Sequence, residues 1–279
     1  MRQLPVRRLT YFLGPFLVSI LLVTSCSIIS SGNNVNTPTP GRSPTITPTS
    51  SLLHLHYTPY QALMAQVYDL GPVYVTADGI VPAQALRIAS MTLATMLRHR
   101  PDVISVLQSY GTITVIIGRD QNICDIPYFT IYKGSDVCMS NEGGTDGMLG
   151  LPVTACNERN ILKESDDPYG RGTLPDGQNF CVHELAHTIM DIGLSQADSD
   201  RIEARYEAAK TASLWSGDYA MTNDLEFFAE MSQAYFWSDS AVPDSNNHYG
   251  INGPDALKQY DPQTFALIDS IYRGSSNLE

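Results

Sequence analysis

The chain has 279 residues, 43% of them hydrophobic, and a formal net charge of −12 at pH 7. This length and composition allow a sizeable core, in one large domain or two small ones. The excess of acidic residues argues against nucleic acid as a partner and against docking on anionic lipid, because both attract clustered Lys and Arg.

Residues 1–25 predict a lipoprotein signal peptide. Arg2, Arg7 and Arg8 precede the short apolar run YFLGPFLVSILLV, as in a secretion signal. The run is shorter than the about 20 apolar residues that a membrane span needs. It ends in Val-Thr-Ser before Cys26, which resembles a bacterial lipobox. We expect cleavage before Cys26 and a lipid on it; the alternative is an ordinary cleaved signal with an incidental thiol.

Residues 26–51 predict a lipidated cysteine followed by a disordered tether. The stretch is rich in Ser, Thr and Pro and has few large apolar side chains to bury. We find no repeat and no second linker after it, so one domain is expected over residues 52–279. The sequence therefore predicts an exported monomer, lipid-anchored on the extracytoplasmic face of a bacterial membrane.

Four further cysteines predict disulfide bonds. An even number is typical of disulfide pairs in an exported chain. The set allows three pairings, of which the nearest-neighbour one is preferred: Cys124 with Cys138 and Cys156 with Cys181. A structural zinc site is the alternative, but the spacing lacks the close cysteine pairs that such sites use.

The first half of the domain carries signals of short strands around one helix. Apolar and β-branched runs predict strands, and apolar residues every three or four positions predict a helix. We expect, in chain order, a strand at 73–76, a helix that opens at Pro82 and closes before Pro101, a strand at 112–117 with Ile113, Val115 and Ile117 on one face, and a strand at 148–156. The last, MLGLPVTAC, is expected either at a sheet edge that pairs with a peptide or inside the sheet.

The second half carries helix signals. After a loop at residues 164–179, we expect helices at 180–191 and near 198–212, 223–237 and 262–272. Strands first and helices afterwards predict an α+β domain.

The helix FCVHELAHTIMD, residues 180–191, contains the strongest motif. His183 and His187 are four residues apart and therefore share a helix face, with Glu184 beside the first. This is the HExxH arrangement of zinc metallopeptidases, in which the histidines hold the metal and the glutamate acts as general base. The apolar flank leaves one alternative, a core helix with two buried histidines.

A catalytic zinc site needs three protein ligands and an open fourth position. The metzincin extension is excluded, because the sequence has Met190 and Gly193 where that class needs glycine and histidine. No histidine lies between positions 187 and 248. The residues alone leave four candidates for the third ligand, all in the two later helices: Glu203, Glu207, Glu226 and Glu230.

The segment LWSGDYAMTNDLEFFAEMSQAYF, from Leu214 to Phe236, resembles the catalytic domain of the anthrax lethal factor and the related secreted Pro-Pro endopeptidases. In that family a tyrosine, a Thr-Asn step and a Glu-Phe-Phe-Ala-Glu-like run follow the HExxH helix. The likeness covers roughly residues 179–237 and includes Asp191, one turn after His187. It implies a gluzincin: a zincin-like domain with a small sheet followed by the HExxH helix and a helix that carries the glutamate ligand.

The resemblance also implies roles for single residues. It makes His183, His187 and Glu226 the ligands of one catalytic zinc ion and Glu184 the general base. Tyr219 becomes the donor to the transition state.

Glu230 and Asp191 become outer-shell carboxylates in the same resemblance. The alternatives are a solvated helix face for Glu230, a local helix-end contact for Asp191, and for Tyr219 packing beside Trp215 and Phe228. The sequence departs from the toxin after the tyrosine, where it has Ala-Met in place of a small and then a basic residue. Substrate contacts at that point therefore need not transfer.

The sequence thus predicts a surface-anchored zinc endopeptidase that acts on a peptide or protein. Two alternatives stay open. One is a non-catalytic surface binding module in which zinc only holds the fold; Glu184 and Tyr219 disfavour it, because a structural site needs neither. The other is a thermolysin-like peptidase with Glu207 as third ligand, although its context RYEAAKT lacks the Asn-Glu pair of those enzymes.

Overall fold

The computed structural model describes residues 60–64, 74–134, 144–164, 178–239 and 249–274. The predicted signal peptide, Cys26, the tether and the start of the domain at residue 52 lie outside these ranges, as do Cys138 and most of the predicted loop at 164–179. Within the described ranges, each helix is too short or too polar to cross a membrane.

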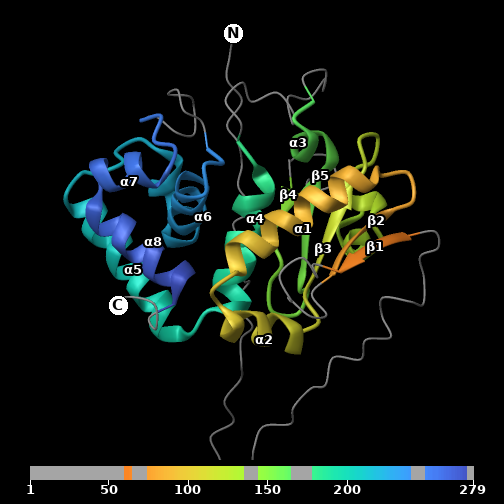
Figure 1. The fold of residues 1–279 in the computed structure, drawn as a ribbon, viewed down its shortest axis with the longest axis horizontal. Helices are drawn as coiled ribbons and strands as arrows, with labels where there is room; N and C mark the ends of the chain where they lie inside the picture. Colours follow the sequence, from red (N-terminus) through yellow and green to blue (C-terminus); the bar gives the residue numbers. More distant parts are fainter. Residues whose placement is uncertain (1–59, 65–73, 135–143, 165–177, 240–248, 275–279) are drawn as a thin grey trace, which may run out of the picture. The chain divides into compact units, whose positions relative to one another are not determined.

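In the described part of the chain, five strands form one sheet, in the order β1-β2-β3-β5-β4. The three central strands are parallel, and the two outer ones run antiparallel to their neighbours. Their bounds are β1 Tyr60–Met64, β2 Tyr74–Asp78, β3 Ile113–Ile117, β4 Gly144–Thr145 and β5 Val153–Asn157 (Figure 1). The strands predicted at 73–76 and 112–117 are confirmed as β2 and β3, whereas β1 was not predicted.

The strand predicted at 148–156 is correct only in its second half. Of its two expected placements, the one inside the sheet is confirmed and the one at a sheet edge is wrong. β5 begins at Val153 and pairs with β3 on one side and β4 on the other. Its five residues are all buried, which fits an inner strand with apolar side chains on both faces. The outer strand on this side is β4, whose two residues pair with Cys156 and Ala155.

Side chains alternate across β3 as its sequence predicts. Ile113, Val115 and Ile117 pack in one apolar cluster with Phe129, while Ile116 belongs to a second cluster shared with the helices. The first cluster includes residues of two short 3₁₀ segments, Ile123–Asp125 and Pro127–Tyr132. The prediction that these three side chains share one face of the strand is therefore confirmed.

Helix α1, Ala83–Leu97, packs against β1 and β2. It ends before Pro101, as predicted, but the same proline opens a second helix, α2, Pro101–Ser109. Proline suits the first position of a helix because its missing N–H has no partner to lose there. A short helix, α3, Glu158–Leu162, follows β5.

The rest of the described chain is helical. The elements are α4 Phe180–Thr188, a π-helical turn η6 Ile189–Gly193, α5 Gln196–Thr211, a 3₁₀ turn η7 Tyr219–Thr222, α6 Asp224–Tyr235, α7 Pro254–Tyr260 and α8 Pro262–Arg273. Helix α4 contacts β5 on one side and α6 on the other, and α6 also contacts α5, α7 and α8 (Figure 1). The mixed α+β class is confirmed. The order is less simple than strands followed by helices, because α1 and α2 lie between β2 and β3; α7 was not predicted.

Candidate metal centre

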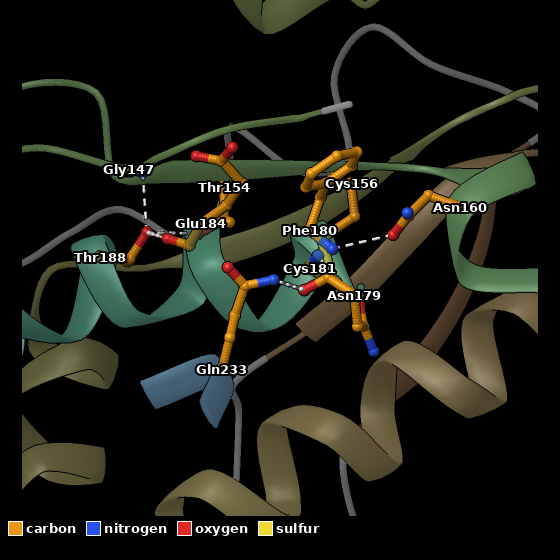
Figure 2. The surroundings of a disulfide bond; sticks show 10 residues. All are labelled: Gly147, Thr154, Cys156, Asn160, Asn179, Phe180, Cys181, Glu184, Thr188 and Gln233. Atoms are coloured by element: carbon orange, nitrogen blue, oxygen red, sulfur yellow. Dashed lines mark hydrogen bonds between the residues drawn. A yellow bond between two sulfur atoms is a disulfide. The ribbon is translucent and has the colours of Figure 1, made fainter. Parts of the chain in front are cut away.

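The first turn of α4 is fixed by a cap and a disulfide. The side chain of Asn179 accepts a hydrogen bond from the backbone N–H of Cys181 at 3.0 Å, which satisfies one free N–H of the helix start. Cys181 is joined to Cys156 of β5, so the helix is linked covalently to an inner strand (Figure 2). This predicted pair is confirmed; Cys124 is also disulfide-bonded, whereas Cys138 lies outside the described residues.

The last turn of α4 is held by a threonine hydroxyl. Thr188 Oγ1 donates to the carbonyl of Glu184 at 3.0 Å and accepts the N–H of Gly147 at 2.8 Å. It also lies 2.7 Å from Thr154 Oγ1, on β5 (Figure 2). Both ends of α4 are thus tied to the β4–β5 side of the sheet.

His183, His187 and Glu226 converge on one point. The Nε2 atoms of the two histidines lie 3.0 Å apart. Glu226 Oε2 lies 3.1 Å from His183 Nε2 and 3.4 Å from His187 Nε2. Bonds of about 2.0–2.1 Å in a tetrahedral zinc site place the ligand atoms roughly 3.3–3.4 Å apart. Two imidazoles and one carboxylate with these separations therefore fit a zinc ion with an open fourth position.

Helix α6 places the carboxylate because its start is capped beside Glu226. Asn223 is the N-cap, and its side chain accepts the N–H of Glu226 at 2.8 Å. The helix predicted near 223–237 is confirmed as α6, Asp224–Tyr235.

The contacts within this group shift the pKa values of Glu226 and His183 in opposite directions. Burial alone would raise the pKa of Glu226, but hydrogen bonding to His183 and His187 outweighs it and lowers that pKa. Burial likewise opposes charge on His183, yet Glu226 and Glu230 raise its pKa well above the ordinary value. The point where the ligand atoms meet therefore favours a positive charge.

Glu184 lies beside this group and against the outer strand. A Cβ at Gly144 would stand 2.7 Å from Glu184 Cγ and 2.5 Å from the carbonyl oxygen of Ala155, so only glycine leaves room here. Burial raises the pKa of Glu184 to about 7, against the opposing effect of His183 and His187. Such a carboxyl exchanges a proton readily at neutral pH.

The ring of Tyr219 lies near that of His183. Tyr219 begins η7, whose N-cap is Asp218, and its ring centroid lies 6.2 Å from that of His183. The half-buried ring stands in the turn just before α6. Trp215 packs on other rings, those of Tyr249 and Tyr260.

Two side chains of α6 approach the far nitrogen of His183. Glu230 Oε1 lies 3.1 Å from His183 Nδ1, and Gln233 Oε1 lies 2.9 Å from it. Glu230 is buried, so the predicted alternative of a solvated helix face is wrong. Sequence reasoning missed Gln233, although its place seven residues after Glu226 puts it on the same helix face.

Asp191 lies in the turn η6 after α4. Burial raises its pKa to about 6, and the charges of Asp146 and Asp224 add to the shift, while His187 opposes it. Asp191 is therefore close enough to His187 for an electrostatic contact, within a group of three acidic side chains.

The candidate glutamates of α5 have different surroundings. Glu203 and Glu207 are exposed, and Glu207 Oε1 lies 3.8 Å from Lys210 Nζ. Among the described residues, the metal-ligating group found is that of His183, His187 and Glu226.

No family model matches the chain, and no curated protein does. A similar solved structure is a Pro-Pro endopeptidase (PPEP-2) from Paenibacillus alvei, with 18% identity and a TM-score of 0.41 over 72% of this chain and 98% of that one. Similarity at this level does not assign the chain to a family.

Proposed function

We propose that the protein is a zinc-dependent endopeptidase of the gluzincin type, with His183, His187 and Glu226 as zinc ligands. The observation that carries the proposal is the convergence of these three ligand atoms, 3.0 to 3.4 Å apart, next to Glu184. A structural zinc site is closed by four protein ligands and needs no base beside it, whereas hydrolysis needs an open position on the metal and a base next to that position.

The metal supplies one part of the chemistry. When bound, zinc acts as a Lewis acid that lowers the pKa of water toward about 7 and polarises a peptide carbonyl. Glu184 accepts the proton that the water loses and passes it to the leaving amine.

Tyr219 supplies a hydrogen-bond donor to the carbonyl oxygen of the peptide bond that is cleaved. Its phenol O–H donates to the carbonyl oxygen as negative charge develops there. The ring stands next to His183, at 6.2 Å between centroids, which is within reach of a substrate carbonyl in this group. This contact strengthens in the transition state and therefore raises the rate more than it raises substrate affinity.

Strand β4 is the part of the sheet that we propose pairs with the substrate. It is the outer strand on the side of α4, and Gly144 packs directly against Glu184. A peptide that adds as a further strand here uses backbone hydrogen bonds, which suits an endopeptidase because they need no particular side chain. The scissile bond would then pass beside the base.

The direct test is cleavage of a peptide library by the purified protein, with products read by mass spectrometry. We expect cleavage within peptides that a chelator abolishes and added zinc restores. The matched control is Glu184→Gln, which has the same size and keeps the zinc ligands. Cleavage by that variant at the full rate would contradict the proposal, and zinc binding without cleavage of any peptide would favour the binding module.

Lipid anchoring through Cys26 on the extracytoplasmic face of a bacterial membrane is a further part of the proposal, resting on the sequence. Mass spectrometry of the membrane-extracted protein should find a diacylglyceryl-modified Cys26 as the first residue. A mature chain that starts elsewhere, or an unmodified Cys26, would remove this part and leave the enzymatic proposal intact.

A further inference from the structure

Helix α6 contacts both ring nitrogens of His183. Glu226 faces Nε2 at 3.1 Å, and Glu230 and Gln233 face Nδ1 at 3.1 and 2.9 Å. Positions four and seven residues apart fall on one helix face, which explains why all three meet one imidazole. Gln233 is 1% exposed, so its hydrogen bonds are made without competition from water.

The neighbours of Gln233 fix which end of its amide faces the histidine. Its Nε2 donates to the carbonyls of Asn179 and Ser238, at 3.3 and 3.2 Å. A carbonyl can only accept, so the NH₂ group must lie at this end and Oε1 must point to His183. The two amide hydrogens and the two carbonyls match one to one.

The tautomer of His183 follows from that orientation. Because Gln233 Oε1 only accepts, Nδ1 of His183 must donate, and it carries the ring hydrogen. In the neutral ring Nε2 then keeps its lone pair, which is directed toward Glu226 and His187. This is the form in which an imidazole binds a metal.

Gln233 and Glu230 contribute different properties to the same hydrogen bond. Glu230 brings a negative charge, which makes the ring a stronger donor of electron density to a metal. The amide of Gln233 is neutral but is held at its other end by Asn179, the N-cap of α4, and by Ser238, which follows α6 (Figure 2 shows Gln233 and Asn179). Its orientation is thus locked to the start of the helix that carries the histidines.

We infer that Gln233 is a positioning residue for the metal centre: by accepting from Nδ1, it holds His183 in the tautomer and ring orientation that present Nε2 to the ion. The inference rests on the proposed function, since it requires zinc to bind at His183. Loss of such a partner lowers metal affinity about 10- to 100-fold.

Asn160 offers a matched control. It is also buried, and its side chain holds the start of α4 from the other side: Nδ2 donates to the carbonyl of Gln178 at 3.0 Å, and Oδ1 accepts the N–H of Phe180 at 2.9 Å (Figure 2 shows the contact with Phe180). Both of these hydrogen bonds go to backbone groups, and neither reaches a histidine side chain. Replacing Asn160 therefore disturbs the helix start without removing a partner of the metal site.

The experiment compares Gln233→Met and Asn160→Leu, each close in size to the residue it replaces. Zinc dissociation constants are measured on the folded proteins by competition with a coloured chelator, and the visible absorption of the Co²⁺-loaded forms is recorded. We expect Gln233→Met to bind zinc about 10- to 100-fold more weakly and to shift the Co²⁺ bands. We expect Asn160→Leu to lose thermal stability but to keep both the affinity and the spectrum.

Equal loss of zinc affinity in the two variants would overturn the inference, because it would reduce Gln233 to a structural contact. So would wild-type affinity and spectrum in Gln233→Met. A second variant, Gln233→Glu, keeps an acceptor for Nδ1 when its other oxygen carries a proton, which the carbonyls of Asn179 and Ser238 favour. It should stay within about 10-fold of wild-type affinity; a loss as large as that of a ligand-deleting variant contradicts the inference even if Gln233→Met does not fold. Failure of the unchanged protein to bind zinc would instead sink the proposed function.

Discussion

Helices α5 and α6 both carry two glutamates four residues apart, but the two pairs have opposite surroundings. Glu203 and Glu207 of α5 are exposed to solvent. Glu230 of α6 is buried and Glu226 is largely so, and both contact His183 at 3.1 Å. Spacing on a helix therefore does not distinguish a surface pair from a ligand and its supporting carboxylate.

The residues next to each pair account for the difference. Helix α5 has the polar sequence QADSDRIEARYEAAKT and buries a narrow stripe formed by Ile202, Tyr206 and Ala209. Helix α6 is buried from Phe227 to Ala234 and contacts four other helices. A glutamate in such a helix cannot reach water freely, so it must have a charged or hydrogen-bonding partner. Buried flanks, more than spacing, indicate which glutamate belongs to a site.

The largest expected effect separates the two helices directly. Glu226→Ala should lower zinc affinity by more than the about 10- to 100-fold that loss of a supporting residue costs, because it deletes a ligand. Glu207→Ala, an exposed change in α5, should leave the affinity unchanged. Zinc titration of both variants checks this, and the reverse ranking would move the protein to the thermolysin-like pattern.

The second effect concerns turnover rather than metal binding. Glu184→Gln removes the proposed base but none of the ligands, so zinc content should stay at one per chain while kcat falls about 10²- to 10⁴-fold. Steady-state kinetics on a peptide found by the library screen, together with metal analysis, measure both quantities. Loss of zinc from this variant would show that Glu184 helps to hold the metal, and would contradict its assignment as a base alone.

A smaller loss is expected at the turn that joins α5 to α6. Tyr219→Phe removes one hydroxyl and leaves the ring that packs near His183, so zinc content and thermal stability should stay near wild type. The kcat should fall on the order of 10²-fold, the scale for one donor to a developing oxyanion. A fully active variant would limit the contribution of this segment to packing.

The smallest effect is on stability and concerns Asp191 of η6, whose carboxyl lies near those of Asp146 and Asp224. The pKa of Asp191 is raised from 3.8 to about 6 in the folded protein, so the folded state binds more protons than the unfolded state between these values. Its unfolding free energy should therefore fall as pH rises from about 4 to 6. In chelator-treated protein, Asp191→Asn should remove the part of this dependence that Asp191 contributes, while the part from Glu184, whose pKa is raised to about 7, stays. The variant should be more stable than wild type at pH 7 by on the order of 1 kcal/mol after screening; urea unfolding measured at several pH values checks both statements.

Much of this site was predictable from the sequence, and the reasons are local. The i, i+4 spacing of His183 and His187 needs nothing beyond helix geometry, and Cys156 with Cys181 is a nearest-neighbour pair. Glu226 was chosen through the resemblance, since the residues alone left four glutamates open. The apolar run around it, Phe-Phe-Ala-Glu-Met, carried the burial signal that separates it from Glu207. The catalytic and ligand roles themselves remain predictions.

The outer strand and the second helix were beyond sequence reasoning for physical reasons. Gly144–Thr145 is too short to show an alternating pattern, and its strand character comes from pairing with β5. Pro101 was read as a stop, but it is also the first residue of α2. Gln233 matters because two carbonyls from other segments hold its amide, and such non-local contacts leave no periodic signal.

The most direct test of the account is anomalous scattering at the zinc edge from crystals of the zinc-loaded protein. We predict a single peak bonded to His183 Nε2, His187 Nε2 and Glu226, at about 2.0–2.2 Å from each, with the fourth position facing Glu184. A peak held by cysteines, by Glu207 of α5, or by four protein ligands with no open position would contradict it.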